Sequence, residues 1–361
     1  MNLHVNNTSM VPVFRKIADA LREKIINGEL KCGDKLPTEH QLSEMFNTSR
    51  MTLRKGLHIL EEQQLIVQKH GVGAFVTHEM EHRHFRVAVM EIPALNGEYG
   101  VTMMSELMHE LSKNNDCSFI FLRTRDVPAE ELMREFQQLK CDGLIAIAPP
   151  GPLRRLICGN MFDNIPAVII GTDCRELRKA GRYVVDISPE AIDQALDYLQ
   201  GLGHEKIAYI SADCDDITLQ GRNRQFLKSV KARKLYCGSG YYLARVVPSW
   251  YDAAREHVRG LCAGTDRPTA VLCPGALFAY GAWQGIMDAG LRIPEDISII
   301  GFDCSLHSNP HLSTLAQPMR DIAGTAARQL LDCLRFKQKP GSGGKLFPAE
   351  ILERGSCRRH V

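Results

Sequence analysis

The sequence predicts two domains, a small N-terminal α+β domain and a larger α/β domain built on parallel sheets. Residues 36–77 contain two short helical patterns, followed by two short strand patterns with glycines between them. From residue 85 onward, short apolar runs alternate with amphipathic helical stretches. The chain has 361 residues, of which 44 % are apolar, so it can bury a second core beside that of a small module.

The first helical pattern begins at Thr38, whose side chain is placed to accept backbone N–H bonds as an N-cap. Leu42, Met45 and Phe46 then recur at helical spacing. The segment 47–49 interrupts the pattern, so we expect a short helix and a tight turn.

The second helical pattern begins at Ser49. Its buried stripe is expected to consist of Leu53, Leu57 and Leu60. This leaves Arg50, Thr52 and Arg54 near the N-terminal end of the helix. In helix-turn-helix proteins these positions contact base edges, and arginine can donate two bonds to guanine O6 and N7. The pattern therefore predicts a winged helix-turn-helix that reads DNA, with its two helices over about residues 39–58.

Several motifs stand together between residues 12 and 77. They are Val13-Phe14-Arg15-Lys16-Ile17, Gly28-Glu29-Leu30, Gly33-Asp34-Lys35-Leu36-Pro37-Thr38-Glu39, Ser49-Arg50 with Thr52-Leu53-Arg54, and His70-Gly71-Val72-Gly73. With these motifs the segment resembles the GntR family of bacterial repressors, which implies a DNA-binding domain over residues 11–77. The residues expected at the DNA are Arg50, Thr52, Arg54, Lys69, His70, Gly71 and His40.

His40 departs from the pattern, because the family commonly has an arginine there that binds a backbone phosphate. A histidine is ordinarily mostly neutral at pH 7, so we expect a weaker contact. The alternative for the whole domain is a winged helix used only for protein association.

The charge of the chain is nearly balanced, with a net charge of +2. Residues 1–77 carry ten Lys/Arg against eight Asp/Glu, and the remaining residues carry 34 of each sign. This small surplus argues against bulk electrostatic capture of nucleic acid. It favours binding of double-stranded DNA through a few placed contacts made by a homodimer. The symmetry of such a dimer predicts that its operator is an inverted repeat.

The start of the chain lacks a signal-peptide pattern and no run of eighteen apolar residues occurs, so we expect no membrane partner and a cytoplasmic protein. The twelve cysteines are scattered without a C-x-x-C pair. We therefore expect reduced thiols.

A polar segment at 78–84 predicts a linker before the apolar strand that begins at Phe85. The apolar runs FRVAVMEI, SFIFLR, DGLIAIA, PAVIIGTD, KIAYISA, TAVLCP and DISIIGFD then alternate with helices expected at about 102–114, 129–139, 189–202, 221–233 and 277–289. This alternation predicts parallel sheets covered by helices on both faces. Two such lobes joined by crossing strands would place strand ends around a central cleft.

Further motifs occur in this region. They are Asp142-Gly143-Leu144-Ile145, Gly203-His204-Glu205-Lys206-Ile207-Ala208, Arg222 before Phe226, the run from Ile293 to Asp303, and Thr314-Leu315-Ala316-Gln317-Pro318. By them, residues 85–356 resemble the ligand-sensing domain of the LacI repressor family, which is periplasmic-binding-protein-like and two-lobed. The two resemblances together imply a multidomain regulator similar to arabinose repressors. Such a protein represses carbohydrate-utilisation genes under the control of a small sugar-like effector.

Three positions carry over onto the sugar pocket of that family, namely Arg222, Trp250 and Asp303. Arg222 offers a fork of donors to adjacent hydroxyls, Asp303 accepts from two of them, and Trp250 presents a flat face to a pyranose ring. The resemblance therefore implies an uncharged sugar or sugar derivative. Where LacI relatives usually have an Asn-Asp pair, this chain has Gly275-Ala276, which predicts a less hydroxylated ligand, a different mode of binding, or no ligand.

Two other functions remain open, a sugar-binding module whose N-terminal unit is an adaptor, and an enzyme that uses the α/β cleft. The segment from His78 to His82 satisfies the H-E-x-x-H pattern of zinc proteases, but it lies in the expected linker instead of on a stable helix. We therefore expect no catalytic residues, no cofactor and no metal site.

Overall fold

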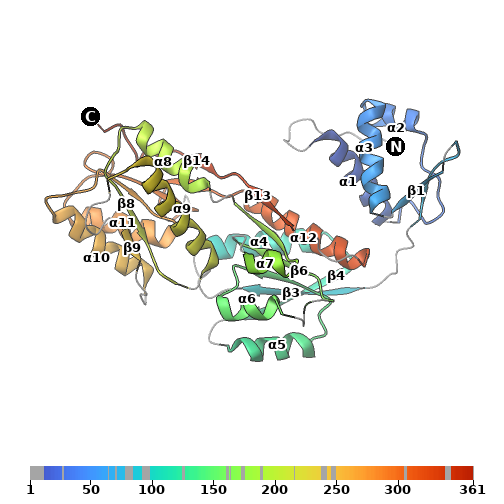
Figure 1. Ribbon diagram of the computed structural model, residues 1–361, viewed down its shortest axis with the longest axis horizontal. Coiled ribbons are helices and arrows are strands. Elements are labelled where there is room, and N and C mark those ends of the chain that lie inside the picture. The colour runs from blue at the N-terminus through green and yellow to red at the C-terminus, as the bar shows by residue number, and fades with distance from the viewer. Residues whose placement is uncertain are drawn as a thin grey trace. The chain divides into compact units, whose positions relative to one another are not determined.

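The computed structural model describes residues 12–26, 28–63, 65–69, 71–77, 84–91, 98–123, 127–159, 162, 164–171, 175–187, 190–214, 216–236, 242–244, 249–304, 307–337 and 343–360. The chain divides into two compact units, Met1–Arg83 and His84–Val361. Figure 1 labels the elements of each unit.

The N-terminal unit is a winged helix-turn-helix. Its elements are α1 (Val13–Ile26), α2 (Glu39–Met45), α3 (Arg50–Glu62), β1 (Ile66–Lys69) and β2 (Gly73–Val76), and the two strands form an antiparallel hairpin. Helix α1 was not among the predicted elements. It packs on α3 so closely that a Cβ at Gly56 would lie 2.9 Å from the Phe14 carbonyl oxygen.

The two predicted helix starts are confirmed. Thr38 forms a capping box with Gln41 at the start of α2, and the Ser49 side chain accepts from the Thr52 backbone N–H at the start of α3. The predicted stripe residues Leu53, Leu57 and Leu60 are all buried. Short-range polar bonds thus set where each helix begins, and the apolar stripe sets which face of α3 is buried.

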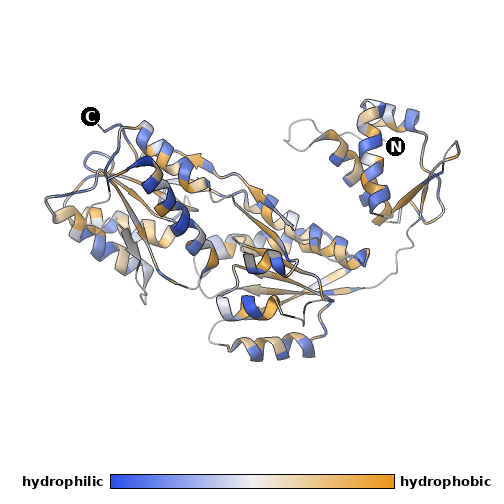
Figure 2. Cartoon of the chain, in the orientation of Figure 1, coloured by the Kyte–Doolittle hydropathy of each residue, from blue (hydrophilic) through white to orange (hydrophobic). Residues whose placement is uncertain are grey.

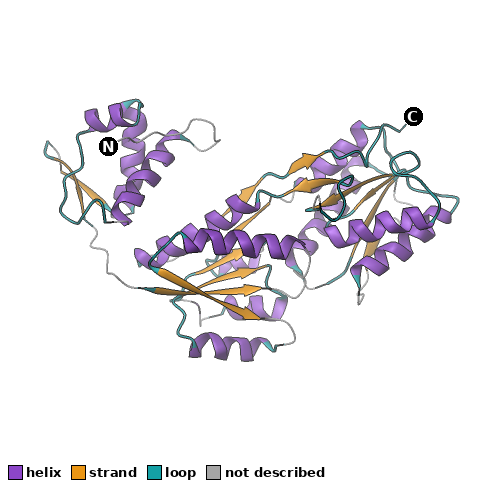
Figure 3. Cartoon of the chain, turned by 180° about the vertical axis from the view of Figure 1, so that it is seen from behind, coloured by secondary structure: helices purple, strands orange, loops and turns teal. Residues whose placement is uncertain are grey.

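The second unit has two lobes, each built on a six-stranded sheet. In the first lobe the order is β13-β7-β6-β5-β3-β4, and all neighbours are parallel. The strands are β3 (Phe85–Glu91), β4 (Cys117–Arg123), β5 (Gly143–Ile147), β6 (Ala167–Ile170), β7 (Tyr183–Ile187) and β13 (Gly343–Phe347). The helices are α4 (Glu98–Ser112), α5 (Ala129–Gln138), α6 (Gly151–Ile157), α7 (Arg175–Lys179) and α12 (Met319–Arg335). Figure 3 shows helices on both sides of this sheet.

In the second lobe the order is β14-β12-β11-β10-β8-β9, with only β14 antiparallel to its neighbour. The strands are β8 (Ile207–Ser211), β9 (Tyr242–Ala244), β10 (Ala270–Leu272), β11 (Ser298–Phe302), β12 (Ser313–Ala316) and β14 (Glu350–Leu352). The helices are α8 (Ala191–Gly201), α9 (Ile217–Arg233), α10 (Trp250–Ala263) and α11 (Ala276–Asp288).

The chain crosses between the lobes after β7, after β12 and after β13, because successive elements belong to different sheets. Central strands such as β5, β6, β8 and β11 are buried along their whole length, as strands covered on both faces must be. Figure 2 shows the matching concentration of hydrophobic residues in the strands. The predicted two-lobed α/β fold with parallel sheets is confirmed.

Helices α10 and α11 pack closely against each other at Gly281 of α11. A Cβ at Gly281 would lie 2.1 Å from the Tyr251 carbonyl oxygen, so Gly281→Ala is expected to destabilise this lobe by about 1–3 kcal/mol. The matched control is Gly260→Ala on α10, where nothing lies within 4 Å and replacement of glycine in a helix is expected to stabilise by up to about 1 kcal/mol. Urea unfolding followed by tryptophan fluorescence measures both, since the two tryptophans, Trp250 and Trp283, lie in this lobe. Equal stability of the two variants would contradict the close approach.

Candidate functional site

The N-terminal half of α3 exposes polar side chains while its opposite stripe is buried. Arg50 and Arg54 are exposed, and Met51 between them is 67 % exposed. Such side chains contribute little to the core of the unit, so this end of the helix is available to a partner.

Arg54 is held by an ion pair across the helix-turn-helix. Its Nε donates to both carboxylate oxygens of Glu39, at 2.9 and 3.1 Å. Because both bonds use Nε, the outer guanidinium nitrogens are not consumed by this contact. The Thr52 hydroxyl lies 2.9 Å from Ser49 Oγ, so it takes part in the cap of α3.

The wing is a hairpin with an exposed tip. Lys69 ends β1, with its Nζ 5.3 Å from the centroid of the Phe75 ring. Gly71 has a φ of 73°, a conformation that glycine adopts without strain, and Val72 beside it is 53 % exposed. His70 lies outside the described residues. The seventh predicted DNA residue, His40, is exposed on α2 with its Nε2 3.6 Å from Glu44 Oε1.

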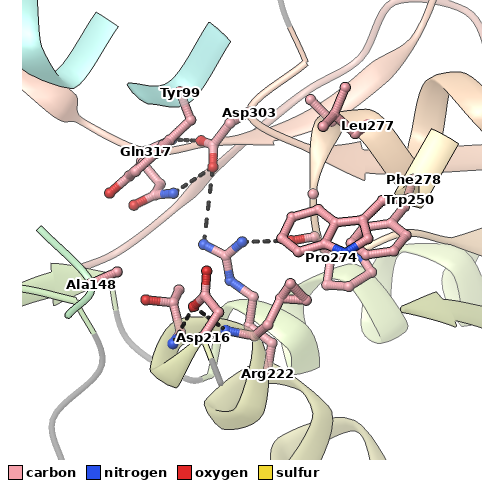
Figure 4. A pocket seen from close by; sticks show the side chains of 14 residues that line it. Tyr99, Ala148, Asp216, Arg222, Trp250, Pro274, Leu277, Phe278, Asp303 and Gln317 are labelled. Carbon is pink, nitrogen blue, oxygen red and sulfur yellow. Dashed lines mark hydrogen bonds and ion pairs between the residues drawn. The ribbon is translucent and has the colours of Figure 1, made fainter. Parts of the chain in front are cut away.

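The three predicted ligand residues meet in one pocket of the second unit, which is partly open to solvent (Figure 4). Arg222 comes from α9, Trp250 is the first residue of α10, and Asp303 directly follows β11. Tyr99 and Ala148 line the pocket from the first lobe. The pocket therefore lies between the lobes, a common place for a small-molecule site.

Arg222 and Asp303 form a buried ionic contact, with 4.0 Å between Arg222 Nη2 and Asp303 Oδ2 and side chains 9 % and 5 % exposed. Arg222 Nη1 donates to the Pro274 carbonyl oxygen at 2.6 Å, and the guanidinium carbon lies 4.3 Å from the centroid of the Phe302 ring. These contacts fix the orientation of the guanidinium. They leave its Nε and Nη2 groups able to donate to a ligand.

Gln317 positions Asp303, and it was missed as a site residue even though it lies inside a motif of the resemblance. Its backbone N–H donates to Asp303 Oδ1 at 3.2 Å, and its side-chain amide donates to Oδ2. Burial raises the pKa of Asp303, whereas the charge of Arg222 and the bonds from Gln317 act to lower it. Asp303 has a φ of 55°, a region in which Asp and Asn are better tolerated than most residues.

The opposite side of the pocket is apolar. Trp250 stacks on Phe278, with ring centroids 5.0 Å apart and an interplanar angle of 14°. Gly275, Ala276 and Leu277 complete this wall. The Gly275-Ala276 departure thus lies at the pocket itself, and Figure 4 shows the two aromatic rings on the other side of Arg222 from Gln317.

Asp216 lines the same pocket and was also missed from the sequence. Its Oδ1 accepts from the backbone N–H groups of Thr218 and Leu219, at 2.8 and 3.1 Å, so it caps α9. An N-cap aspartate before a helix was the signal that could have identified its place in the fold.

Within the described ranges, no group of three or more His, Cys, Asp or Glu side chains is arranged to hold a metal ion. The H-E-x-x-H segment falls on residues 78–82, which lie outside those ranges. None of the helices that the structure describes is long and apolar enough to cross a membrane.

Comparison with known proteins gives two matches to family models. Residues 14–76 match the bacterial regulatory proteins of the gntR family, and residues 196–357 match the periplasmic binding protein-like domain. The arabinose metabolism transcriptional repressor of Geobacillus stearothermophilus is 25 % identical over 96 % of this chain and 98 % of its own length. The repressor CytR of Escherichia coli K12 is 30 % identical over 54 % of this chain and 57 % of its own.

Among solved structures, the lac repressor dimer bound to operator and an anti-inducer has the same fold as the second unit. The TM-score is 0.64 at 18 % identity, covering 76 % of this chain and 95 % of that one. The similar proteins are regulators and not enzymes. The chain is a DNA-binding transcriptional regulator that joins a winged helix-turn-helix domain of the GntR family to a periplasmic-binding-protein-like domain of the LacI type.

Proposed function

We propose that the protein is a homodimeric repressor of carbohydrate-utilisation genes whose binding to an inverted-repeat operator is controlled by a sugar-like effector. The DNA-binding domain comprises residues 11–77, the linker residues 78–84 and the sensor domain residues 85–356. The effector binds to Arg222, Trp250 and Asp303. Because the partner is chromosomal DNA, the protein acts in the cytoplasm. The observation that carries the proposal is a pocket with a buried Arg222–Asp303 pair in a chain that also exposes Arg50 on a recognition helix.

The control mechanism follows from the two-lobed pocket. A ligand that touches Tyr99 or Ala148 on one lobe and Arg222 on the other favours a closed arrangement of the lobes. In a symmetric dimer this closure changes the spacing of the two DNA-binding domains, and so their fit to two half-sites. Release of DNA requires tighter effector binding to the state that does not bind the operator, with a coupling of typically about 1–3 kcal/mol.

A footprint of the purified protein on DNA upstream of its own and neighbouring genes tests the proposal. It is made at one fixed salt concentration, with and without a panel of pentoses, hexoses, uronic acids, glycosides and nucleosides. A protected inverted repeat that one compound releases is the expected result. Sugar binding without any protected DNA would instead support the adaptor function, and turnover of a bound carbohydrate would support an enzyme.

His40→Arg is expected to tighten operator binding several-fold. The new cation can bind a backbone phosphate, and a dimer gains two such contacts, which steepens the dependence of log affinity on log salt by roughly 2. Filter binding or fluorescence anisotropy over a salt series measures this slope. His40→Gln is the control without added charge. A tighter complex with an unchanged salt slope would exclude the phosphate contact.

A further inference from the structure

The pocket is polar at one end and apolar at the other. From this division we propose that the effector is an uncharged glycoside with a flat aglycone, either an aromatic ring or a nucleobase, and not a free sugar. The inference rests on the proposed function only in taking this pocket as the effector site.

The polar end contains buried groups that lack partners. Among the described residues, Arg222 Nε and Nη2 and Gln317 Oε1 have no hydrogen-bond partner, although each atom is shielded from solvent. Burial without a partner is costly, so a ligand must supply acceptors to Arg222 and a donor to Gln317. Neighbouring hydroxyls of a sugar ring do both, since each hydroxyl donates and accepts.

The charges around the pocket select against an anion. Arg222 is already in ionic contact with Asp303 at 4.0 Å, and Asp216 adds a second carboxylate to the lining. A ligand carboxylate or phosphate would offer no donor to Gln317 and would lie near two negative side chains. This argues against uronic acids and sugar phosphates as effectors.

The wall from Pro274 to Phe278 offers no side-chain hydrogen-bonding group, and Leu277 within it is 37 % exposed. Hydroxyls of a free sugar that faced this wall would find no side-chain partner there and would meet only backbone groups at the start of α11. A flat aglycone would instead bury apolar surface against Leu277 and beside the stacked pair Trp250 and Phe278.

The backbone at Gly275 does not require glycine, so the lack of a polar side chain at this position comes from the sequence alone. Gly275 has an extended conformation with φ −168°, which any residue adopts. A Cβ at this position would lie 3.6 Å from the nearest atom, Phe278 Cδ2, an ordinary contact. The backbone at Gly275 therefore accepts a Cβ, and Gly275→Asn restores a polar group at this position.

Isothermal titration calorimetry of the full-length protein with matched ligand pairs tests the inference. The pairs are methyl and phenyl glycosides of the same pentose or hexose, and ribose against uridine and adenosine. In at least one pair the flat-aglycone member is expected to bind about tenfold more tightly or better. The phenyl glycosides and the nucleosides distinguish the two sources of the aglycone.

Substitutions in the apolar wall test whether it causes the preference for ligands with a flat aglycone. Trp250→Ala and Leu277→Ala are expected to reduce the tenfold preference to less than about threefold, and Gly275→Asn to shift it toward the free sugar. Trp283 does not line the pocket, so the control substitution Trp283→Phe should leave the preference unchanged. The second wall variant keeps the test valid if Trp250→Ala misfolds.

Three results would overturn the inference. They are free sugars binding as tightly as their aromatic partners, an anionic ligand binding most tightly, or no ligand binding to a protein that still protects its operator. Operator footprinting is independent of calorimetry. A protein that binds glycosides but no DNA would therefore refute the proposed function and leave the ligand class standing.

Discussion

Arg50→Ala is expected to abolish specific operator binding while leaving the fold intact. Arg50 is the first residue of α3 and is exposed, so its removal leaves no cavity. A bidentate arginine–guanine contact contributes about 1–3 kcal/mol, and a dimer makes two, which corresponds to a loss of roughly 30-fold or more in affinity. Competition between operator and unrelated DNA of equal length, in a mobility-shift assay, measures the loss as a specificity ratio.

His58→Ala is the matched control for Arg50→Ala. His58 is also exposed on α3, but it lies two turns further along the helix, with its Nε2 3.4 Å from Glu62 Oε1. Its replacement should leave the specificity ratio unchanged. If Arg50→Ala kept the wild-type ratio, the assignment of Arg50 as a base-reading residue would be wrong.

Asp303→Ala is expected to remove the effector response without weakening operator binding in the absence of effector. The substitution deletes the acceptor for Gln317 and leaves the buried cation Arg222 without its partner, a loss of about 3–5 kcal/mol in stability of the lobe. It also places alanine at a positive φ, which adds strain.

Asp303→Asn separates ligand binding from folding. Asparagine tolerates the left-handed backbone conformation and can still accept from Gln317, but it lacks the charge. Loss of a charge-assisted bond to the ligand is expected to weaken effector binding by roughly 10- to 150-fold. Operator release measured against effector concentration gives this shift. An effector dose curve that matches wild type in both variants would reject Asp303 as a ligand residue.

Much of the N-terminal unit could be predicted from neighbouring residues. Thr38 and Ser49 mark the starts of α2 and α3, and the stripe from Leu53 to Leu60 gives the buried face, because caps and helical spacing act over three or four residues. Contacts between distant residues could not be predicted this way. The Arg54–Glu39 ion pair joins residues fifteen positions apart, and the α1–α3 contact needs the folded unit.

The ligand pocket shows the same division. Arg222, Trp250 and Asp303 were predicted from a resemblance, and the alternation of strands and helices predicted the two lobes, which the structure confirms. Only the tertiary structure shows that Gln317 donates to Asp303. It also shows that an apolar wall lines the opposite side of the pocket. The sequence by itself determines local structure and the order of elements, because those signals lie within a few residues. Only the tertiary structure decides the composition of the pocket, because its lining comes from residues 99 to 317, brought together at strand ends of two sheets.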